Sequence, residues 1–359
     1  MSEIDHEKEY NAYINDQEAK FKAQKFYFSF SSLVKLMLDP RKFYKEYILG
    51  EREKLSAKFL DIGSLLHCLV LEPENYDEKF VVMPKKVPGG KIKSVLDKVY
   101  KTYGNIKVKE NPNLIFHLDD FKDEIIEELK SADLYQGLVD NTKLVKGVLL
   151  SKKDKQLEKV FTPENKQYFD VLIEGSKRII VDMDMNLKAH EKAKAILANP
   201  KAMELLTEKS KKQEVRMELE LKSEFNDKYP FGLKGILDCV KIDYKNATIH
   251  IVDLKTTSKT LQAWAESFMT SEYNYWLQPI VYKELILGMI PKTSKDKWTM
   301  KIHYVVVDGN NQVYCYPVSA ESLVKWERMA VGAYDIGKWH LDNHNFKLPY
   351  NYAKNLVEL

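Results

Sequence analysis

Two aspartates and one lysine carry the clearest chemical signal in this sequence. Asp238 lies in the apolar stretch 233–244, and a second alternating stretch, 248–254, contains Asp253 and is followed directly by Lys255. Paired carboxylates offer hard oxygen ligands, which suit Mg²⁺ or Mn²⁺ better than zinc. A cation held there could activate water for phosphodiester hydrolysis, and the lysine could orient that water or stabilise charge on the phosphate.

A β-hairpin would bring these side chains together. Both stretches have strand character, and Lys245 and Asn246 between them are polar and turn-prone. If the hairpin closes with a two-residue loop there, residues whose numbers sum to 491 pair, and Asp238 faces Asp253. Lys255 then projects from the same face as Asp253, because side chains alternate along a strand.

The alternative is that both carboxylates lie in solvent at a strand end. An acidic-x-basic triplet is uninformative alone, because 53 acidic and 56 basic residues among 359 give on the order of eight such triplets by chance. The apolar strands, the facing register and the glycine that opens the first strand raise a metal site to equal standing with this alternative, and both stay open at this point.

Composition limits the class of protein. The hydrophobic content of 44% is ample for a core, and a net charge of +3 neither requires nor excludes nucleic-acid binding. Three widely spaced cysteines indicate a reducing cytoplasm and no zinc or iron–sulfur cluster. No membrane span or signal peptide is predicted. We expect a loosely ordered segment at 1–25, then a single domain at 26–359 with a lysine-rich, mostly helical insertion at about 85–160.

Three further segments could contribute to a site. The apolar helix predicted at 58–71 carries His67, which is either a metal ligand or a core histidine bonded to a backbone carbonyl. The alternating segment 214–221 precedes the hairpin, so either Glu214 or Glu218 could lie near the metal, unless its charges are simply the solvent face. A helix predicted at about 261–289 places Gln278 and Tyr282 on one face, either for packing or aimed at the site.

The order of strands and helices predicts an α/β fold with a central mixed sheet flanked by helices. The motifs resemble the RecB-like branch of the PD-(D/E)xK nucleases, whose core is restriction-endonuclease-like, and specifically the phage and prophage exonucleases of the RecE (exonuclease VIII) type. The matching stretches are FSFSSLVKLMLDPRKFYKEYI, DIGSLLHCLVLEP, GLKGILD, IVDLKTT and NYWLQPIVY, in the order found in that group.

The resemblance implies roles for individual residues. Lys255 would orient the attacking water or stabilise the transition state, and Glu214 is the expected upstream acidic residue. Relatives often have an arginine where this chain has Ile236, so Lys234 would supply the basic charge. The implied metal ligands are His67, Asp238, Asp253 and the carbonyl of Leu254, and Gln278 and Tyr282 would support the site or contact DNA.

The resemblance also implies a function. Such relatives are Mg²⁺-dependent exonucleases that degrade linear double-stranded DNA from the 5′ end and leave 3′ single-stranded tails. They work with a phage single-strand annealing protein, and many form homo-oligomeric rings, here expected in the cytoplasm of a bacterial host. Two alternatives stay open at this point: a RecB-like endonuclease, and a non-cleaving DNA-binding scaffold with a nuclease fold.

Overall fold

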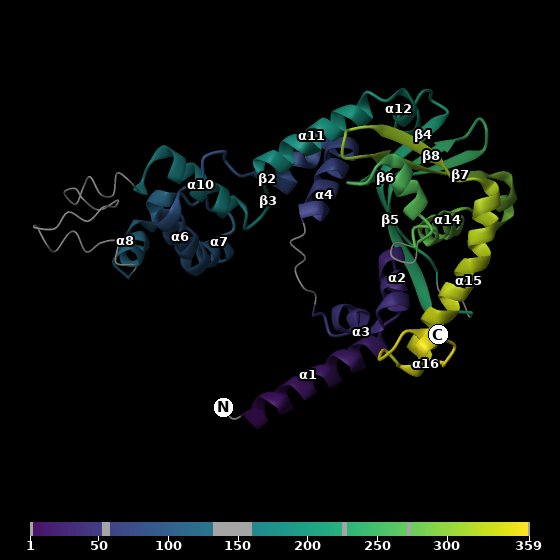
Figure 1. Cartoon of the computed structure of the whole chain (residues 1–359), viewed down its shortest axis with the longest axis horizontal. Helices are drawn as coiled ribbons and strands as arrows, with labels where there is room; N and C mark the ends of the chain where they lie inside the picture. Colours follow the sequence, from purple (N-terminus) through teal and green to yellow (C-terminus); the bar gives the residue numbers. More distant parts are fainter. Residues whose placement is uncertain (1–2, 52–57, 132–159, 225–227, 271–273, 358–359) are drawn as a thin grey trace, which may run out of the picture. The chain divides into compact units, whose positions relative to one another are not determined.

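The computed structural model describes residues 3–51, 58–131, 160–224, 228–270 and 274–357. The chain divides into two compact units, one formed by residues 1–71 with 191–359 and the other by 72–190. The division falls within helix α11 (Met183–Leu197) (Figure 1). Within the lysine-rich insertion predicted at 85–160, residues 132–159 lie outside the described part of the chain.

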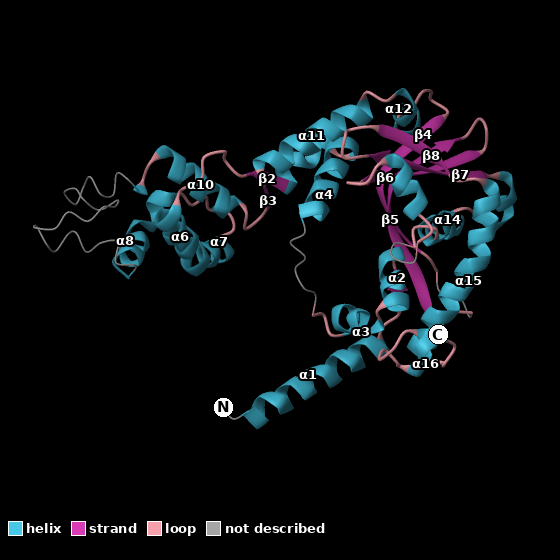
Figure 2. Cartoon of the chain, viewed as in Figure 1, coloured by secondary structure: helices cyan, strands magenta, loops and turns pink. Residues whose placement is uncertain are grey.

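A six-stranded mixed sheet forms the centre of the first unit (Figure 2). Its order is β1-β5-β6-β7-β8, with β4 pairing to β5; β1 is parallel to β5 and β7 to β6, and the other pairs are antiparallel. The predicted α/β class with a mixed central sheet is therefore confirmed. The strands are β1 (Phe26–Phe28), β4 (Gln213–Lys222), β5 (Phe231–Asp243), β6 (Thr248–Thr256), β7 (Thr299–Val307) and β8 (Val313–Pro317).

The β5–β6 hairpin has the register predicted from the sequence. Asp243 pairs with Thr248 and Cys239 with Val252, so paired residue numbers sum to 491. The turn is longer than predicted and covers residues 244–247, of which Ala247 has a left-handed backbone (φ 45°). The ladder ends at Cys239, one position before Asp238 would pair with Asp253.

Helices cover both faces of this sheet. On one face α2, α14 and α15 pack against Leu237, Val240 and Ile251. On the other face α4, α12 and the end of α11 pack against a layer that includes Cys239 and Val252. The helices are α2 (Phe30–Leu38), α3 (Pro40–Phe43), α4 (Lys58–Leu71), α12 (Pro200–Leu206), α13 (Leu261–Ser267), α14 (Leu277–Met289), α15 (Ala320–Asn343) and α16 (Tyr350–Ala353).

The N-terminal segment, expected from the sequence to be loosely ordered, contains helix α1 (Glu3–Ala23). Phe21 at its end is buried. The Tyr13 hydroxyl donates to the carbonyl of Leu49 at 2.5 Å, and the Tyr44 hydroxyl donates to Glu18 at 2.5 Å. These contacts attach the second half of α1 to the first unit.

The long helix predicted at 261–289 is wrong, since the structure forms α13 and α14 instead. Asn274, just before α14, has a left-handed backbone (φ 48°), which no α-helix continues through. The carbonyl of Ser267, the last residue of α13, accepts from both the amide N–H and the hydroxyl of Thr270, three residues later.

The second unit is mostly helical around its own core. Strands β2 (Phe80–Val82) and β3 (Ile179–Val181) form a short parallel pair. The core includes Leu96, Phe121 and Phe169. Its helices are α5 (Tyr76–Lys79), α6 (Gly90–Val99), α7 (Asn105–Glu110), α8 (Lys122–Ser131) and α10 (Pro163–Glu174). None of the helices in the described ranges is both long enough and apolar enough to span a bilayer.

Candidate active site

The regular alternation of side chains along strand β5 is interrupted at Asp238. Leu237 packs in the layer with α14, whereas Cys239, two residues later, packs in the layer with α4. Alternate residues of a regular strand lie on one face, so the strand is irregular at the residue between them. Asp238 therefore lies where neither apolar layer covers the sheet completely.

Strand β4 changes face at the facing position, Glu218. Met217 packs with the α4 layer and Leu219 with the α14 layer. Both residues pair with β5, but Glu218 does not. Its backbone is left-handed (φ 45°), a conformation that is uncommon for residues other than glycine. The two irregular positions turn both carboxylates toward α4.

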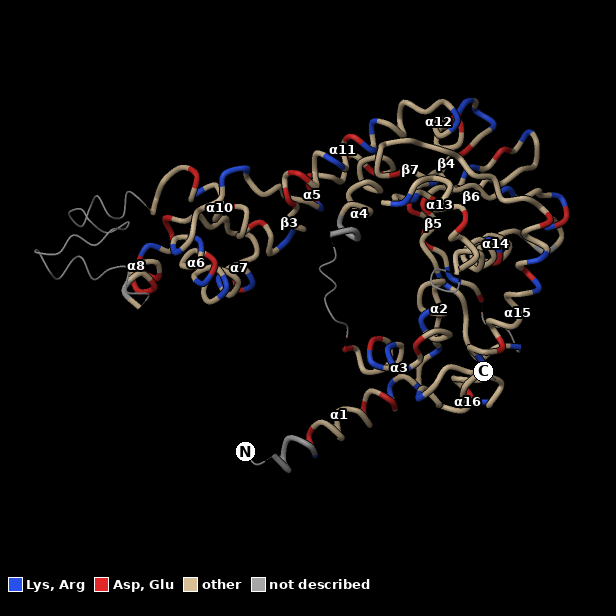
Figure 3. Tube along the Cα trace, viewed as in Figure 1, with Lys and Arg blue, Asp and Glu red and all other residues tan. Residues whose placement is uncertain are grey.

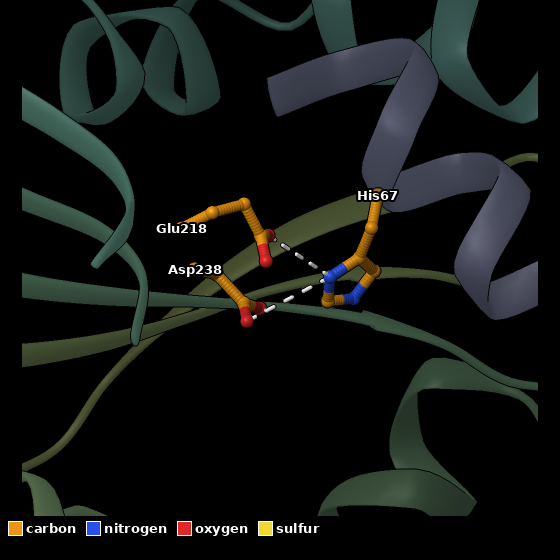
Figure 4. A group of neighbouring side chains, drawn as sticks. All are labelled: His67, Glu218 and Asp238. Carbon is orange, nitrogen blue, oxygen red and sulfur yellow. Dashed lines mark ion pairs between the residues drawn. The ribbon is translucent and has the colours of Figure 1, made fainter. Parts of the chain in front are cut away.

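Three ligand-type side chains meet at this point (Figure 4). One ligand atom each from His67, Glu218 and Asp238 lie within 4.8 Å of one another. His67 Nδ1 lies 3.7 Å from Glu218 Oε1 and 3.7 Å from Asp238 Oδ1. Helix α4 supplies the imidazole and the consecutive strands β4 and β5, distant from α4 in sequence, supply the carboxylates.

A backbone contact orients the imidazole. His67 Nε2 lies 3.0 Å from the carbonyl oxygen of Leu254. Since a carbonyl only accepts, Nε2 carries the proton and the lone pair of the neutral ring lies on Nδ1, toward the carboxylates. Histidine ligands of metals are commonly fixed in this way. Burial lowers the pKa of His67, but the neighbouring carboxylates of Glu218 and Asp238 outweigh it and raise the pKa overall.

The carboxylates of Asp238, which is buried, and Glu218, which is half-buried, lie close together without full compensation. Burial and the neighbouring Asp253 raise the pKa of Asp238. Asp238 Oδ2 accepts the amide N–H of Leu254 at 2.7 Å, but Glu218 Oε1 is buried with no hydrogen-bond partner among the described residues. An unpaired buried carboxylate oxygen beside an oriented imidazole nitrogen fits a divalent cation.

Asp253 lies beside the group of three. It is 1% exposed. Its Oδ2 lies 2.5 Å from Lys255 Nζ. Burial lowers the pKa of Lys255, but the charges of Asp253 and Asp238 outweigh it and raise the pKa, so the lysine stays protonated. Asp253 and Lys255 thus form a largely buried ion pair, and the alternative in which the carboxylates lie in solvent at a strand end does not describe Asp253.

Gln278 and Tyr282 contact the site directly. Gln278 Nε2 donates to Asp253 Oδ1 at 2.9 Å and to the Tyr282 hydroxyl at 2.8 Å. The hydroxyl donates in turn to the carbonyl of Ile236 at 3.1 Å. That carbonyl belongs to the part of β5 before its ladder with β6 begins. This polar chain from α14 fixes the carboxylate plane of Asp253.

Glu214 is not part of the group, which corrects the choice made from the sequence. It pairs with Ile242, at the opposite end of β4 from the loop that leads to β5. Its carboxylate accepts from Arg216 Nε at 2.7 Å and from the Tyr244 hydroxyl at 2.5 Å. Alternation places Glu214 and Glu218 on one face of a regular strand. Only the pairing of β4 with β5, together with its break at Glu218, distinguishes them.

The predicted ligand set is therefore brought together in part. The structure groups His67 and Asp238 with Glu218. Asp253 binds Lys255 and Gln278, and the carbonyl of Leu254 accepts from His67. Lys234 is exposed on β5, where it lines a pocket beside Lys255.

Comparisons with known proteins show what the chain is similar to. A crystal structure from Eubacterium rectale, described as a putative exonuclease, aligns with 90% of this chain and 83% of its own at 12% identity and a TM-score of 0.44. None of the curated proteins matches the chain. The family model described as "PD-(D/E)XK nuclease superfamily" matches residues 144–342, a range that contains Glu218, Asp238, Asp253 and Lys255. Since the match covers more than half of the sequence, the chain belongs to the PD-(D/E)XK nuclease superfamily.

Proposed function

We propose that the chain is a Mg²⁺- or Mn²⁺-dependent DNA exonuclease of the RecE type, which degrades linear double-stranded DNA from the 5′ end and leaves 3′ single-stranded tails. The observation that carries the proposal is the ligand group His67, Glu218 and Asp238 beside the Asp253–Lys255 ion pair. Membership of the nuclease superfamily supports the hydrolytic reaction. The finer features, including polarity, rest on the resemblance of the sequence motifs to RecE-type exonucleases.

The chain's own residues prepare the site for a phosphodiester. His67, Glu218, Asp238 and Asp253 would hold the cation. When bound, the cation would supply a hard positive charge that activates water and stabilises charge on the phosphate. The Leu254 carbonyl keeps His67 Nδ1 directed at the carboxylates, so the ligand geometry is largely formed in advance.

Lys255 has a separate task in this proposal. Its charge is maintained by Asp253, with which it forms the ion pair. A protonated lysine next to the ligand group can orient water or contact a phosphate oxygen in the transition state. Burial of Asp253 lowers the local dielectric, so these interactions are stronger than at an exposed site.

Substrate and partners follow from the resemblance. Double-stranded DNA ends are the proposed substrate, and a phage single-strand annealing protein and further copies of this chain are the proposed partners. The bacterial host cytoplasm is the proposed location if the chain is phage-encoded. Lysines and arginines are interspersed with acidic residues along the described chain (Figure 3). DNA contact would therefore depend on local groups of basic residues.

The experiment that tests the function uses linear duplex DNA labelled at either the 5′ or the 3′ end, with Mg²⁺, Mn²⁺ or EDTA. We expect metal-dependent release of the 5′ label by the wild type and none by Asp253→Asn or Glu218→Gln. The matched control is Glu214→Gln, which removes an acidic side chain from the same strand outside the group. This control should keep the activity.

The remaining outcomes separate the alternatives. Cleavage of closed circular DNA would indicate a RecB-like endonuclease. Intact linear DNA with both metals, together with a persistent gel shift, would indicate a non-cleaving scaffold. Loss of the 3′ label first would reverse the proposed polarity while keeping the exonuclease activity.

A further inference from the structure

A pocket of about 540 Å³ adjoins the candidate active site. Lys255 and Gln278 form part of its wall, so it begins where the proposed reaction would take place. Helix α2 contributes residues from its N-terminal end, and β4, β5 and α14 form the remaining walls. The other lining residues are Ser29, Phe30, Ser31, Glu220, Lys234, Gly235, Ile236 and Tyr282.

Ile236 is an unusual residue for this place. Its side chain is 52% exposed, although Leu233 and Leu237 on the same strand are buried. It stands between charged and hydroxyl groups, including Lys234 and Ser31. An exposed isoleucine is common on protein surfaces, but one that lines a pocket beside reactive groups offers apolar contact area to a ligand.

The backbone at Ile236 is held firmly. The Tyr282 hydroxyl donates to its carbonyl. Helix α14 also packs closely at the preceding residue, where a Cβ on Gly235 would lie 3.1 Å from Leu285 and 3.2 Å from Tyr282. The side chain of Ile236 is therefore presented by a fixed backbone, which lowers the entropic cost of binding a ligand against it.

The lining defines the chemistry of the occupant. Lys234 and Lys255 suit an anionic group, and the hydroxyls of Ser29 and Ser31 suit hydrogen bonding. Phe30 and Ile236 add apolar surface to the lining, which suits an apolar part of the ligand. A nucleotide combines both parts, since every base presents an apolar face whatever its sequence. The volume lies in the range of pockets that hold small organic molecules.

We propose that this pocket receives the nucleoside next to the phosphate that Lys255 contacts, and that Ile236 packs against its base. The proposal rests on the nuclease function proposed above and adds a specificity-determining contact to it. Because an apolar contact to the base face reads no hydrogen-bonding edge, it requires a base at that position without selecting which base.

The test combines changes in the protein and in the DNA. Wild type and Ile236→Ala are compared on a strand in which one tetrahydrofuran abasic residue is moved stepwise from the end. We expect that, at one position in the strand, the abasic residue weakens binding of the DNA by the wild-type protein about tenfold. Ile236→Ala should weaken binding of normal DNA by a similar factor. The two changes together should give little further loss, because both remove the same contact.

A second pair of variants serves as control and as a check on folding. Lys234→Ala should weaken binding equally for normal and abasic strands and reduce its salt dependence. Ile236→Trp should tighten binding of normal DNA at the same position, because it enlarges the apolar contact. This gain cannot result from misfolding.

Binding is measured by fluorescence anisotropy with Ca²⁺ in place of Mg²⁺, so the result does not depend on turnover. Coupling at one position without any cleavage in Mg²⁺ would leave the pocket proposal standing and overturn the exonuclease. Cleavage in Mg²⁺ without coupling at any position would overturn the pocket proposal and leave the proposed exonuclease standing. An Ile236→Ala variant that binds both strands like the wild type would also overturn the pocket proposal.

Discussion

Glu218 faces Asp238 at an interior break in the β4–β5 ladder, whose pairs continue on both sides of them. The left-handed backbone of Glu218 costs on the order of 1–3 kcal/mol. Repulsion between the half-buried carboxylate of Glu218 and the buried carboxylate of Asp238 adds to this cost. Local stability is therefore lower where the ligand group forms. Such a cost is expected where residues serve binding, and not where they only pair two strands.

The first prediction concerns this backbone strain. Glu218→Asn and Glu218→Gln both remove the carboxylate, but asparagine tolerates the left-handed conformation far better than glutamine. We expect the free energy of unfolding of the asparagine variant to exceed that of the glutamine variant by about 1 kcal/mol. Urea unfolding in EDTA measures both. Equal stabilities would mean that the strand relaxes once the carboxylate is gone.

The second prediction concerns metal binding. Mg²⁺ or Mn²⁺ at about 100 times its dissociation constant should stabilise the wild type by ~2.7 kcal/mol. Asp238→Asn should lose most of this gain but should be more stable than wild type in EDTA, because a repelling charge is removed. Thermal unfolding with and without metal measures both effects. Glu214→Gln is the matched control and should respond to metal like the wild type, since its side chain lies outside the group.

The third prediction concerns the polar chain on α14. Tyr282→Phe removes the hydroxyl between Gln278 and the Ile236 carbonyl and should lower kcat by ~10-fold with little change in KM. Gln278→Ala removes the direct contact to Asp253 and should lower kcat more. The double variant should resemble Gln278→Ala alone, because both residues act through one carboxylate. Equal effects on kcat and KM in a steady-state assay would indicate direct substrate contact instead.

The fourth prediction concerns acid stability. His250 Nδ1 lies 3.2 Å from His303 Nε2 on the neighbouring strand. Burial, with His250, Lys201 and Lys301 nearby, lowers the pKa of His303 to about 4. The unfolded chain takes up this proton near pH 6.5. The stability contribution of neutral His303 is therefore present above pH 6.5 and is lost as the pH falls toward 4.

A variant isolates this effect from the rest of the protein. The raised pKa of Asp238 acts in the opposite sense, since its folded form takes up a proton first. Unfolding in EDTA is therefore compared at pH 7.5 and pH 5 for wild type and His303→Asn. We expect the wild type to lose on the order of 2 kcal/mol more than the variant on acidification. The same loss in both proteins would contradict a neutral, buried His303.

Much of the central hairpin could be predicted from the sequence. Alternating apolar residues on both sides of a polar turn defined two strands, and their register follows from the turn position, as the pairing of Cys239 with Val252 shows. Local patterns suffice here because the two strands are adjacent in sequence. The predicted pair of Asp238 with Asp253 is not part of the ladder, which ends at Cys239.

Other features depend on contacts that no local pattern encodes. Glu218 could not be chosen over Glu214, because both occupy the same face of a regular strand and only the break at Glu218 separates them. The sequence left open whether His67 is a metal ligand or a core histidine bonded to a backbone carbonyl. The structure combines both features, because Nε2 bonds the carbonyl of Leu254 while Nδ1 faces the carboxylates. Asn274 interrupts a segment whose apolar pattern predicts one helix.

The hydrogen bond from the Leu254 amide to Asp238 Oδ2 has a consequence for how this site is dissected. That carboxylate replaces the backbone partner that strand β5 no longer offers to β6. An Asp238→Ala substitution would leave the buried Leu254 amide without its hydrogen-bond partner. If this variant were inactive, the loss could result from a disturbed sheet as well as from the missing metal ligand. Asparagine keeps an oxygen for the amide and removes only the charge. An alanine substitution at position 238 would therefore overstate how much the Asp238 charge contributes to catalysis.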